Sequence, residues 1–204
     1  MGGYPPQIVF GSLNMEYIDN KMTDFKGIKY KDASNWIGFI PQPSRAIRYL
    51  EIGVLCGNNV LSVEKLYANH PDSVLTCVDP WIDYGEYPEY KGVITTYYDM
   101  FVENTDHISP KLDVRRGLSH AILPMLEDES FDIIYIDGNH ETCYVLEDGV
   151  MAFRKLKVGG WMVFDDYEGN DVPPGIHAFI DGYKKRISKY ISLRGCQVFI
   201  QKTS

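Results

Sequence analysis

Residues 47–59 read IRYLEIGVLCGNN, a β-rich run that leads into a turn with two glycines. Gly53 and Gly57 allow a tight turn and a close approach of the backbone to a ligand, and Asn58 is suited to begin the helix that follows. The spacing is G-x-x-x-G rather than the G-x-G-x-x-G of dinucleotide-binding proteins. No Gly-Lys-Ser follows the second glycine, which excludes a Walker phosphate loop.

Short β-rich runs alternate with longer amphipathic runs along the rest of the chain. After residues 47–52, strands are expected at 74–79, 112–116, 131–137 and 161–166. Helices are expected at 59–70, 90–105, 118–128, 140–157 and 174–186, and the helix from 140 should stop at Gly159-Gly160. Only Gly195 separates two last β-rich runs, 189–194 and 196–202, so they must pair antiparallel. The sequence predicts an α/β, Rossmann-like, doubly wound and mostly parallel seven-stranded sheet with a C-terminal antiparallel hairpin.

The length of 204 residues indicates one domain, with residues 1–46 as an N-terminal helical cap and 47–204 as the Rossmann-like core. The formal net charge of −8 disfavours general binding of nucleic acids. No run reaches the roughly 18 apolar residues of a membrane helix, and the first residues lack the pattern of a secretory signal. Four scattered cysteines indicate reduced core thiols. We therefore expect a cytoplasmic protein without a membrane partner.

Ligands of open α/β sheets bind beyond the carboxyl ends of the strands, so the residues at those ends are the candidates for a site. Glu51 and Gly53 end the first strand, and Asp79 ends the second, where an acid usually accepts from both hydroxyls of a ribose. Trp81 is suited either to stack on a purine or to pack in the core. The third strand ends at Arg116-Gly117-Leu118-Ser119, where Gly117 and Ser119 would meet the edge of a base. These residues, with Gly57, form the predicted cofactor-binding set.

This combination resembles the class I S-adenosylmethionine-dependent methyltransferases: E-x-G-x-x-x-G, an acid after strand two, Gly-x-Ser after strand three and a terminal hairpin. The resemblance covers about residues 45 to 202. Within that superfamily, YIDGNH (135–140), a helical run and GGWMVFDDY (159–167) resemble the metal-dependent sugar O-methyltransferases that modify deoxysugars of macrolide and aminocoumarin antibiotics. The resemblance implies S-adenosylmethionine as cofactor and a sugar hydroxyl, of a deoxysugar or of a rhamnose-type glycan, as acceptor.

Carboxylates end both of the strands that are predicted to be most buried. Asp137 ends one, and Asp165 with Asp166 ends the other, so three carboxylates should meet at one rim if the strands are neighbours. Their mutual repulsion is relieved by a hard divalent cation, and an all-oxygen set without a nearby cysteine favours Mg²⁺ or Mn²⁺ over zinc. The sequence therefore predicts a metal site made of Asp137, Asp165 and Asp166.

His140 follows Asp137 by three residues, where the resemblance implies a base: catechol-type enzymes carry a lysine there, and some sugar enzymes carry a histidine. We assign His140, with the metal ligand Asp137, to the catalytic step. A helix-start residue without a catalytic role is the alternative for His140.

Two other functions stay open at this stage. One is a catechol or caffeoyl-type O-methyltransferase acting on a small phenol, and the other is a non-catalytic cofactor-binding module. The expected partner is a small-molecule or glycan acceptor, with loop residues Tyr84, Tyr87 and Tyr90 as its candidate walls. Association of the chain as a homo-oligomer is also left open.

Overall fold

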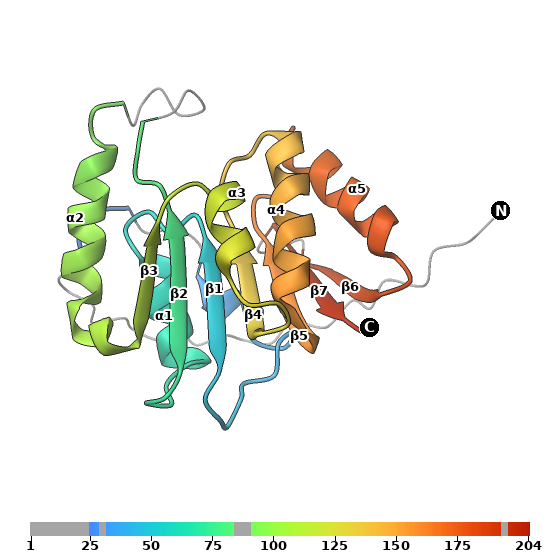
Figure 1. Ribbon diagram of the computed structural model, residues 1–204, viewed down its shortest axis with the longest axis horizontal. Coiled ribbons are helices and arrows are strands. Elements are labelled where there is room, and N and C mark those ends of the chain that lie inside the picture. The colour runs from blue at the N-terminus through green and yellow to red at the C-terminus, as the bar shows by residue number, and fades with distance from the viewer. Residues whose placement is uncertain (1–24, 29–31, 84–90, 193–195) are drawn as a thin grey trace.

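The computed structural model describes residues 25–28, 32–83, 91–192 and 196–204 (Figure 1). Its centre is a seven-stranded sheet in the order β3-β2-β1-β4-β5-β7-β6. The strands are β1 (Arg48–Ile52), β2 (Val74–Asp79), β3 (Leu112–Arg116), β4 (Phe131–Ile136), β5 (Leu156–Phe164), β6 (Ile187–Ser192) and β7 (Gln197–Lys202). The first five are parallel, whereas β7 pairs antiparallel with both β5 and β6. The predicted fold is therefore confirmed, including the terminal hairpin.

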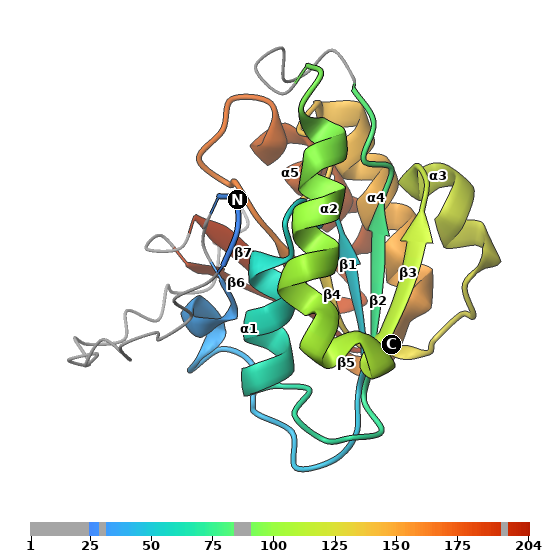
Figure 2. The ribbon, with the colours of Figure 1, turned by 90° about the vertical axis from the view of Figure 1, so that its left-hand side faces the viewer.

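Helices cover both faces of this sheet, as Figure 2 shows with the sheet seen nearly edge-on. The α-helices are α1 (Asn58–Leu66), α2 (Ile94–Thr105), α3 (Ser119–Ile122), α4 (Thr142–Lys155) and α5 (Val172–Tyr183). Three 3-10 helices accompany them: η1 (Ala33–Trp36), η3 (Asp106–Lys111) and η4 (Leu123–Met125). Within the described ranges, every helix is too short or too polar to cross a membrane.

Alternating side chains of the central strands divide the core into two layers. In β4, Ile134 and Ile136 point to the layer that α4 and α5 cover, while Ile133 and Tyr135 point to the layer beneath α1 and η1. This is the period of two that a strand imposes on its side chains. Because both faces are covered, the strand is buried along its whole length, which explains its continuous apolar sequence.

The described part of the N-terminal cap packs on the second of these layers. Trp36 in η1 is fully buried, and its ring lies 5.4 Å from that of Tyr135 and 5.7 Å from that of Tyr67. In residues 25–28 and 32–46 the single helical element is η1. The rest of the expected cap, residues 1–24 and 29–31, lies outside the described part of the chain.

The predicted end of the helix at Gly159-Gly160 is wrong. Helix α4 stops at Lys155, and β5 begins at once with Leu156, so both glycines lie inside the strand. The ammonium of Lys202 in β7 donates to the carbonyls of Phe153 and Leu156 at 3.2 and 2.7 Å. A lysine can satisfy the last carbonyls of a helix in this way, and here it comes from a strand distant in sequence.

The helix predicted at 118–128 is also shorter than expected. It is divided into the single turn α3 and the 3-10 turn η4, which contains Pro124. Proline lacks an N–H and cannot continue an α-helical ladder. Likewise, the helix expected from residue 90 begins only at Ile94, after Gly92 with a φ of +79°.

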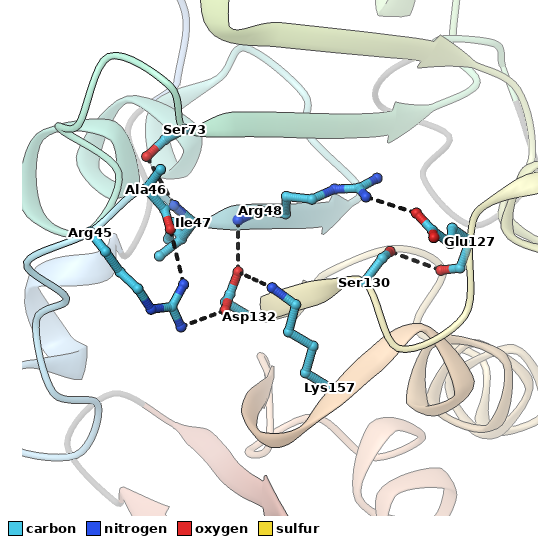
Figure 3. A network of polar contacts seen from close by, with 9 residues as sticks. All are labelled: Arg45, Ala46, Ile47, Arg48, Ser73, Glu127, Ser130, Asp132 and Lys157. Atoms are coloured by element: carbon cyan, nitrogen blue, oxygen red, sulfur yellow. Dashed lines mark hydrogen bonds and ion pairs between the residues drawn. The ribbon is translucent and has the colours of Figure 1, made fainter.

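A network of ion pairs holds the amino ends of the strands together (Figure 3). The carboxylate of Asp132 accepts from Arg45 at 2.7 Å, from Lys157 at 2.9 Å and from the backbone N–H of Arg48 at 2.9 Å. Arg48 also pairs with Glu127 at 3.0 Å. Several of the chain's cations therefore lie at the sheet edge opposite to the carboxyl ends of the parallel strands.

Candidate functional site

A cavity of about 920 Å³ opens at the carboxyl edge of the parallel strands. The segments that follow β1, β2, β3, β4 and β5 all contribute to its lining. This is where the topology of an open α/β sheet places ligands. Its volume is near the upper end of the roughly 300–1,000 Å³ of ordinary small-molecule sites.

The turn after β1 forms the floor of this cavity, and it requires a glycine at Gly53. A Cβ there would lie 1.9 Å from the carbonyl oxygen of Asp137, and the φ of +82° is in the left-handed region. The carboxylate of Asp79 holds the turn, because it accepts from the backbone N–H groups of Val54 at 2.8 Å and Leu55 at 3.0 Å. The end of β2 thereby fixes the backbone that a ligand would approach.

Glu51 lies beneath this turn and is 1% exposed. Its carboxyl accepts from the hydroxyl of Tyr49 at 2.5 Å and from the side-chain amide of Asn59 at 3.1 Å. Burial raises the pKa of Glu51 to about 8, although both hydrogen bonds act in the opposite direction. The carboxyl is thus mostly protonated at neutral pH, and it touches the cavity as a polar but largely uncharged group.

Three residues of the predicted cofactor set lie outside the cavity lining. Trp81 is fully buried, donates from Nε1 to the carbonyl of Leu55 at 2.9 Å and packs on Phe101. Of the two roles that the sequence allowed, packing in the core is therefore the one that the structure shows, and Trp81 is not placed to stack on a ligand. The guanidinium of Arg116 lies over the ring of Tyr98, 4.8 Å from its centre.

Gly57 is the third residue of the predicted cofactor set that does not line the cavity. A Cβ there would lie 3.0 Å from side-chain atoms of both Phe101 and Thr105. It therefore allows α2 to pack closely, and with a φ of +84° it begins α1 in the left-handed region.

Gly117 and Ser119 line the cavity as predicted, together with His120. Asp148 of α4 is 2% exposed, and burial raises its pKa to about 6, while the interaction with Ser119 acts against this rise. The turn after β3 therefore lies beside the helix that follows β4.

Asp137, His140 and Asp166 come together at the rim of the cavity, and their ligand atoms all lie within 4.8 Å of one another. His140 Nε2 lies 3.5 Å from Asp137 Oδ1 and 3.2 Å from Asp166 Oδ2. Burial and the charges of Asp165 and Asp166 raise the pKa of Asp137 to about 7, and its hydrogen bond with His140 acts against this rise. Asp166 has a φ of +52°, a conformation that aspartate adopts more readily than most residues.

Asp165 is not a member of this group, in contrast to the predicted set of three carboxylates. It is 6% exposed, and its Oδ2 accepts from the hydroxyl of Tyr135 at 2.5 Å. The same hydroxyl lies 3.4 Å from Asp137 Oδ2. The backbone is left-handed at Asp166, and the two adjacent side chains differ in direction: Asp165 turns inward to Tyr135, whereas Asp166 faces the rim. His140 occupies the position expected for the third carboxylate.

Sequence reasoning missed two tyrosines that orient the acids of the site. Tyr135 and Tyr49 each stand two residues before a carboxyl group, Asp137 and Glu51 respectively, and period two in a strand puts both members of such a pair on one face. That spacing in the sequence could have identified both tyrosines as partners of the acids. The candidate acceptor walls Tyr84, Tyr87 and Tyr90 lie outside the described residues.

The sequence model of one protein family, described as a methyltransferase domain, matches residues 50–167. The chain belongs to this family. An uncharacterized protein, R132 of Acanthamoeba polyphaga mimivirus, is 29% identical to this methyltransferase domain over 124 residues. The match covers 60% of the chain and 52% of that relative, so the chain matches about half the length of the viral protein.

Solved methyltransferases share the fold of the domain. The O-methyltransferase TomG of Streptomyces achromogenes, solved with S-adenosylmethionine (SAM), has a TM-score of 0.57 and 16% identity, with 78% of this chain and 74% of TomG covered. The O-methyltransferase of Bacillus cereus, solved with S-adenosylhomocysteine (SAH), has a TM-score of 0.54 and 19% identity, with 76% and 72% covered. The predicted class I methyltransferase fold is thus confirmed.

Proposed function

We propose that this domain transfers a methyl group from SAM to a hydroxyl of a sugar, with the help of a divalent cation. The observation that carries the proposal is the convergence of Asp137, His140 and Asp166 beside a cavity formed at the carboxyl ends of β1 to β5. Membership in the methyltransferase family supports the transfer. The choice of a sugar rests on the resemblance of residues 135–140 and 159–167 to sugar O-methyltransferases.

The features of the cavity suit the methyl donor. Gly53 exposes backbone where a Cβ would collide with Asp137, and Asp79 keeps this turn in shape. Asp79 also accepts from the N–H of Trp81 at 2.7 Å, so its carboxylate already has three backbone donors. A carboxylate has about four acceptor sites, which leaves room for a ribose hydroxyl. Ser119, on the far side of the cavity, would meet the edge of the adenine.

The two carboxylates at the rim suit a hard cation. Asp137 and Asp166 offer the oxygen ligands that Mg²⁺ and Mn²⁺ prefer, and His140 lies beside them as the candidate base. When bound, the ion would supply stabilisation of the negative charge that develops on the acceptor oxygen. Asp165 would stay outside the ligand set, with its orientation held by Tyr135.

The chain's own residues account for the remaining requirements of the transfer. The acceptor oxygen forms the new O–CH₃ bond while the S–CH₃ bond breaks, and the electron pair of that bond stays on sulfur to give SAH. The hydroxyl proton passes to His140, whose Nε2 lies at the rim between the two carboxylates. The walls of the cavity hold donor and acceptor in line, which supplies proximity.

Metal removal and one substitution test this mechanism together. Methyl transfer from labelled SAM should stop with EDTA and return with Mn²⁺ or Mg²⁺. His140→Ala should lower kcat by about 10²–10⁴-fold if His140 is a general base, and the residual activity should rise with pH. Mn²⁺ affinity of this variant, measured by titration calorimetry, separates two possible roles of His140. If His140 is a base, the substitution leaves the affinity nearly intact. If it is a ligand, the substitution weakens the affinity strongly.

Controls complete the test. His107→Ala removes an exposed imidazole from η3 and should leave both readings unchanged. Asp166→Asn should abolish Mn²⁺ binding while SAH still raises the melting temperature, because a ligand of the folded state stabilises it by mass action. Full turnover of the metal-free wild type would refute the metal-assisted mechanism. Transfer to catechols but to no sugar would favour the phenol-methylating alternative.

A further inference from the structure

The lining of the cavity is strongly acidic. Ten of its described residues are aspartate or glutamate, two are histidines, His120 and His140, and none is lysine or arginine. This composition differs from that of the phosphate and carboxylate sites that use arginine or lysine. Glu51 beneath the turn after β1 is mostly protonated, whereas Glu141, Glu168 and Asp171, which form the mouth of the cavity, are exposed.

Three exposed acids of the lining lie beside the rim with His140 and Asp166, and a fourth, Asp83, follows β2. Glu141 follows His140 directly, and Glu168 and Asp171 belong to the loop that follows Asp166. The hydroxyl of Thr142 donates to the carbonyl of Asp171 at 2.6 Å, which joins the start of α4 to the end of that loop. Glu141 and Asp171 therefore come from two segments that are attached to each other at the mouth.

A bound cation and the cofactor would not neutralise the exposed acids at the mouth of the cavity. An ion at Asp137 and Asp166 offsets the charge of those two carboxylates, and SAM carries one net positive charge at the donor end. Glu141, Glu168 and Asp171 remain around the acceptor. Arg45, Arg48 and Lys157 pair with other acids at the amino edge of the sheet (Figure 3), whereas Arg116, at the carboxyl end of β3, lies over Tyr98 and outside the lining.

This inference rests on the methyl transfer proposed above. We propose that the acceptor is an uncharged or amine-bearing hydroxyl compound, and that phosphorylated, nucleotide-linked and carboxylated compounds are rejected. A like charge placed against the mouth opposes binding, whereas an ammonium group is attracted to it. The preference is therefore for the amine over the neutral compound, and for the neutral compound over the anion.

Two sets of acceptors with matched shapes test this order. One set is methyl glucoside, its 6-amino-6-deoxy analogue and methyl glucuronide; the other is catechol, dopamine and 3,4-dihydroxybenzoate. Methyl transfer is measured with Mn²⁺ and labelled SAM at low and at physiological salt. In the set that reacts, kcat/KM should fall about tenfold or more from the neutral compound to the anion at low salt. Salt should reduce this ratio, because exposed charges are screened over about 8–10 Å.

Substitutions at the mouth test whether its acids cause the preference for neutral over anionic acceptors. Glu141→Gln with Asp171→Asn should reduce the neutral-to-anion ratio by about two- to fivefold, since each removes one exposed charge without a change of shape. Asp72→Asn with Glu127→Gln removes two charges from the amino edge, where these side chains are 83% and 74% exposed, and should leave the ratio unchanged. An equal reduction of the neutral-to-anion ratio in the mouth variant and in the control would mean that net charge, rather than the acids of the mouth, is responsible. That result would overturn the proposal.

Binding to the SAH-loaded protein, followed by ligand-observed NMR, separates this inference from the proposed function. Binding in the expected order without methyl transfer to any acceptor would refute the O-methyl transfer and retain the charge preference. Transfer or binding that favours the carboxylate or a nucleotide-linked sugar would overturn the preference and retain the methyl transfer. Equal rates for all three members of a set would also overturn it.

Discussion

Glu51→Gln is expected to change how the stability of the protein depends on pH. Glu51 is 1% exposed, and burial raises its pKa from an ordinary value of 4.5 to about 8. The unfolded chain therefore loses this proton at much lower pH than the folded protein does. Because the folded state binds the extra proton, the contribution of Glu51 to the free energy of unfolding falls as pH rises from about 4.5 to 8 and is level above that.

The magnitude follows from the width of that window. One pKa unit corresponds to about 1.4 kcal/mol, so between pH 6 and pH 8 the wild type should lose about 2 kcal/mol through Glu51 alone. Glutamine keeps the size of the side chain and an oxygen that accepts from Tyr49 and Asn59, but it does not titrate. The variant should therefore lose about 2 kcal/mol less than the wild type over the same interval.

Urea denaturation at pH 6 and pH 8, with EDTA and without cofactor, measures this difference. Asp137 and Asp148 also have raised pKa values, so the wild-type profile contains their contributions, and the comparison between variant and wild type removes them. Glu127→Gln is the matched control, because that side chain is 74% exposed. Identical pH slopes in wild type and Glu51→Gln would refute the argument that this carboxyl is held protonated by burial.

Three further substitutions test the contacts that build the site and its frame. Tyr135→Phe should weaken Mn²⁺ binding roughly tenfold in calorimetry, because Asp137 and Asp165 lose a shared hydroxyl; unchanged affinity with a normal melting curve would rule out that orienting role. Gly53→Ala should lower the free energy of unfolding by about 2–4 kcal/mol or prevent folding, since its Cβ would lie 1.9 Å from a carbonyl oxygen. A urea midpoint equal to that of the wild type would contradict this close packing. Lys202→Met should cost roughly 1–3 kcal/mol, because buried carbonyls at the end of α4 lose their donor; a neutral or stabilising result would show that the buried ammonium is not needed to satisfy them.

The sequence alone was sufficient for the mostly parallel sheet with its terminal hairpin and for the edge at which the site lies. Alternation of β-rich and amphipathic runs reports the burial of each segment, and a strand such as β4 is apolar throughout because helices cover both of its faces. Asp79 and Asp137 could be placed at the cavity because each follows directly after a buried strand. Gly53 could be singled out because tight turns need residues that adopt positive φ.

Tertiary structure decided what the sequence pattern does not carry, namely which side chains face each other. Helix α4 ends at Lys155 because Lys202, from a strand 47 positions later, satisfies its last carbonyls, and no local signal marks that contact. Trp81 belongs to the core rather than to the ligand site because α2 packs over it. The exchange of Asp165 for His140 at the rim has the same origin: adjacent carboxylates are equivalent in sequence, and the position of the Tyr135 hydroxyl in three dimensions determines which one turns inward.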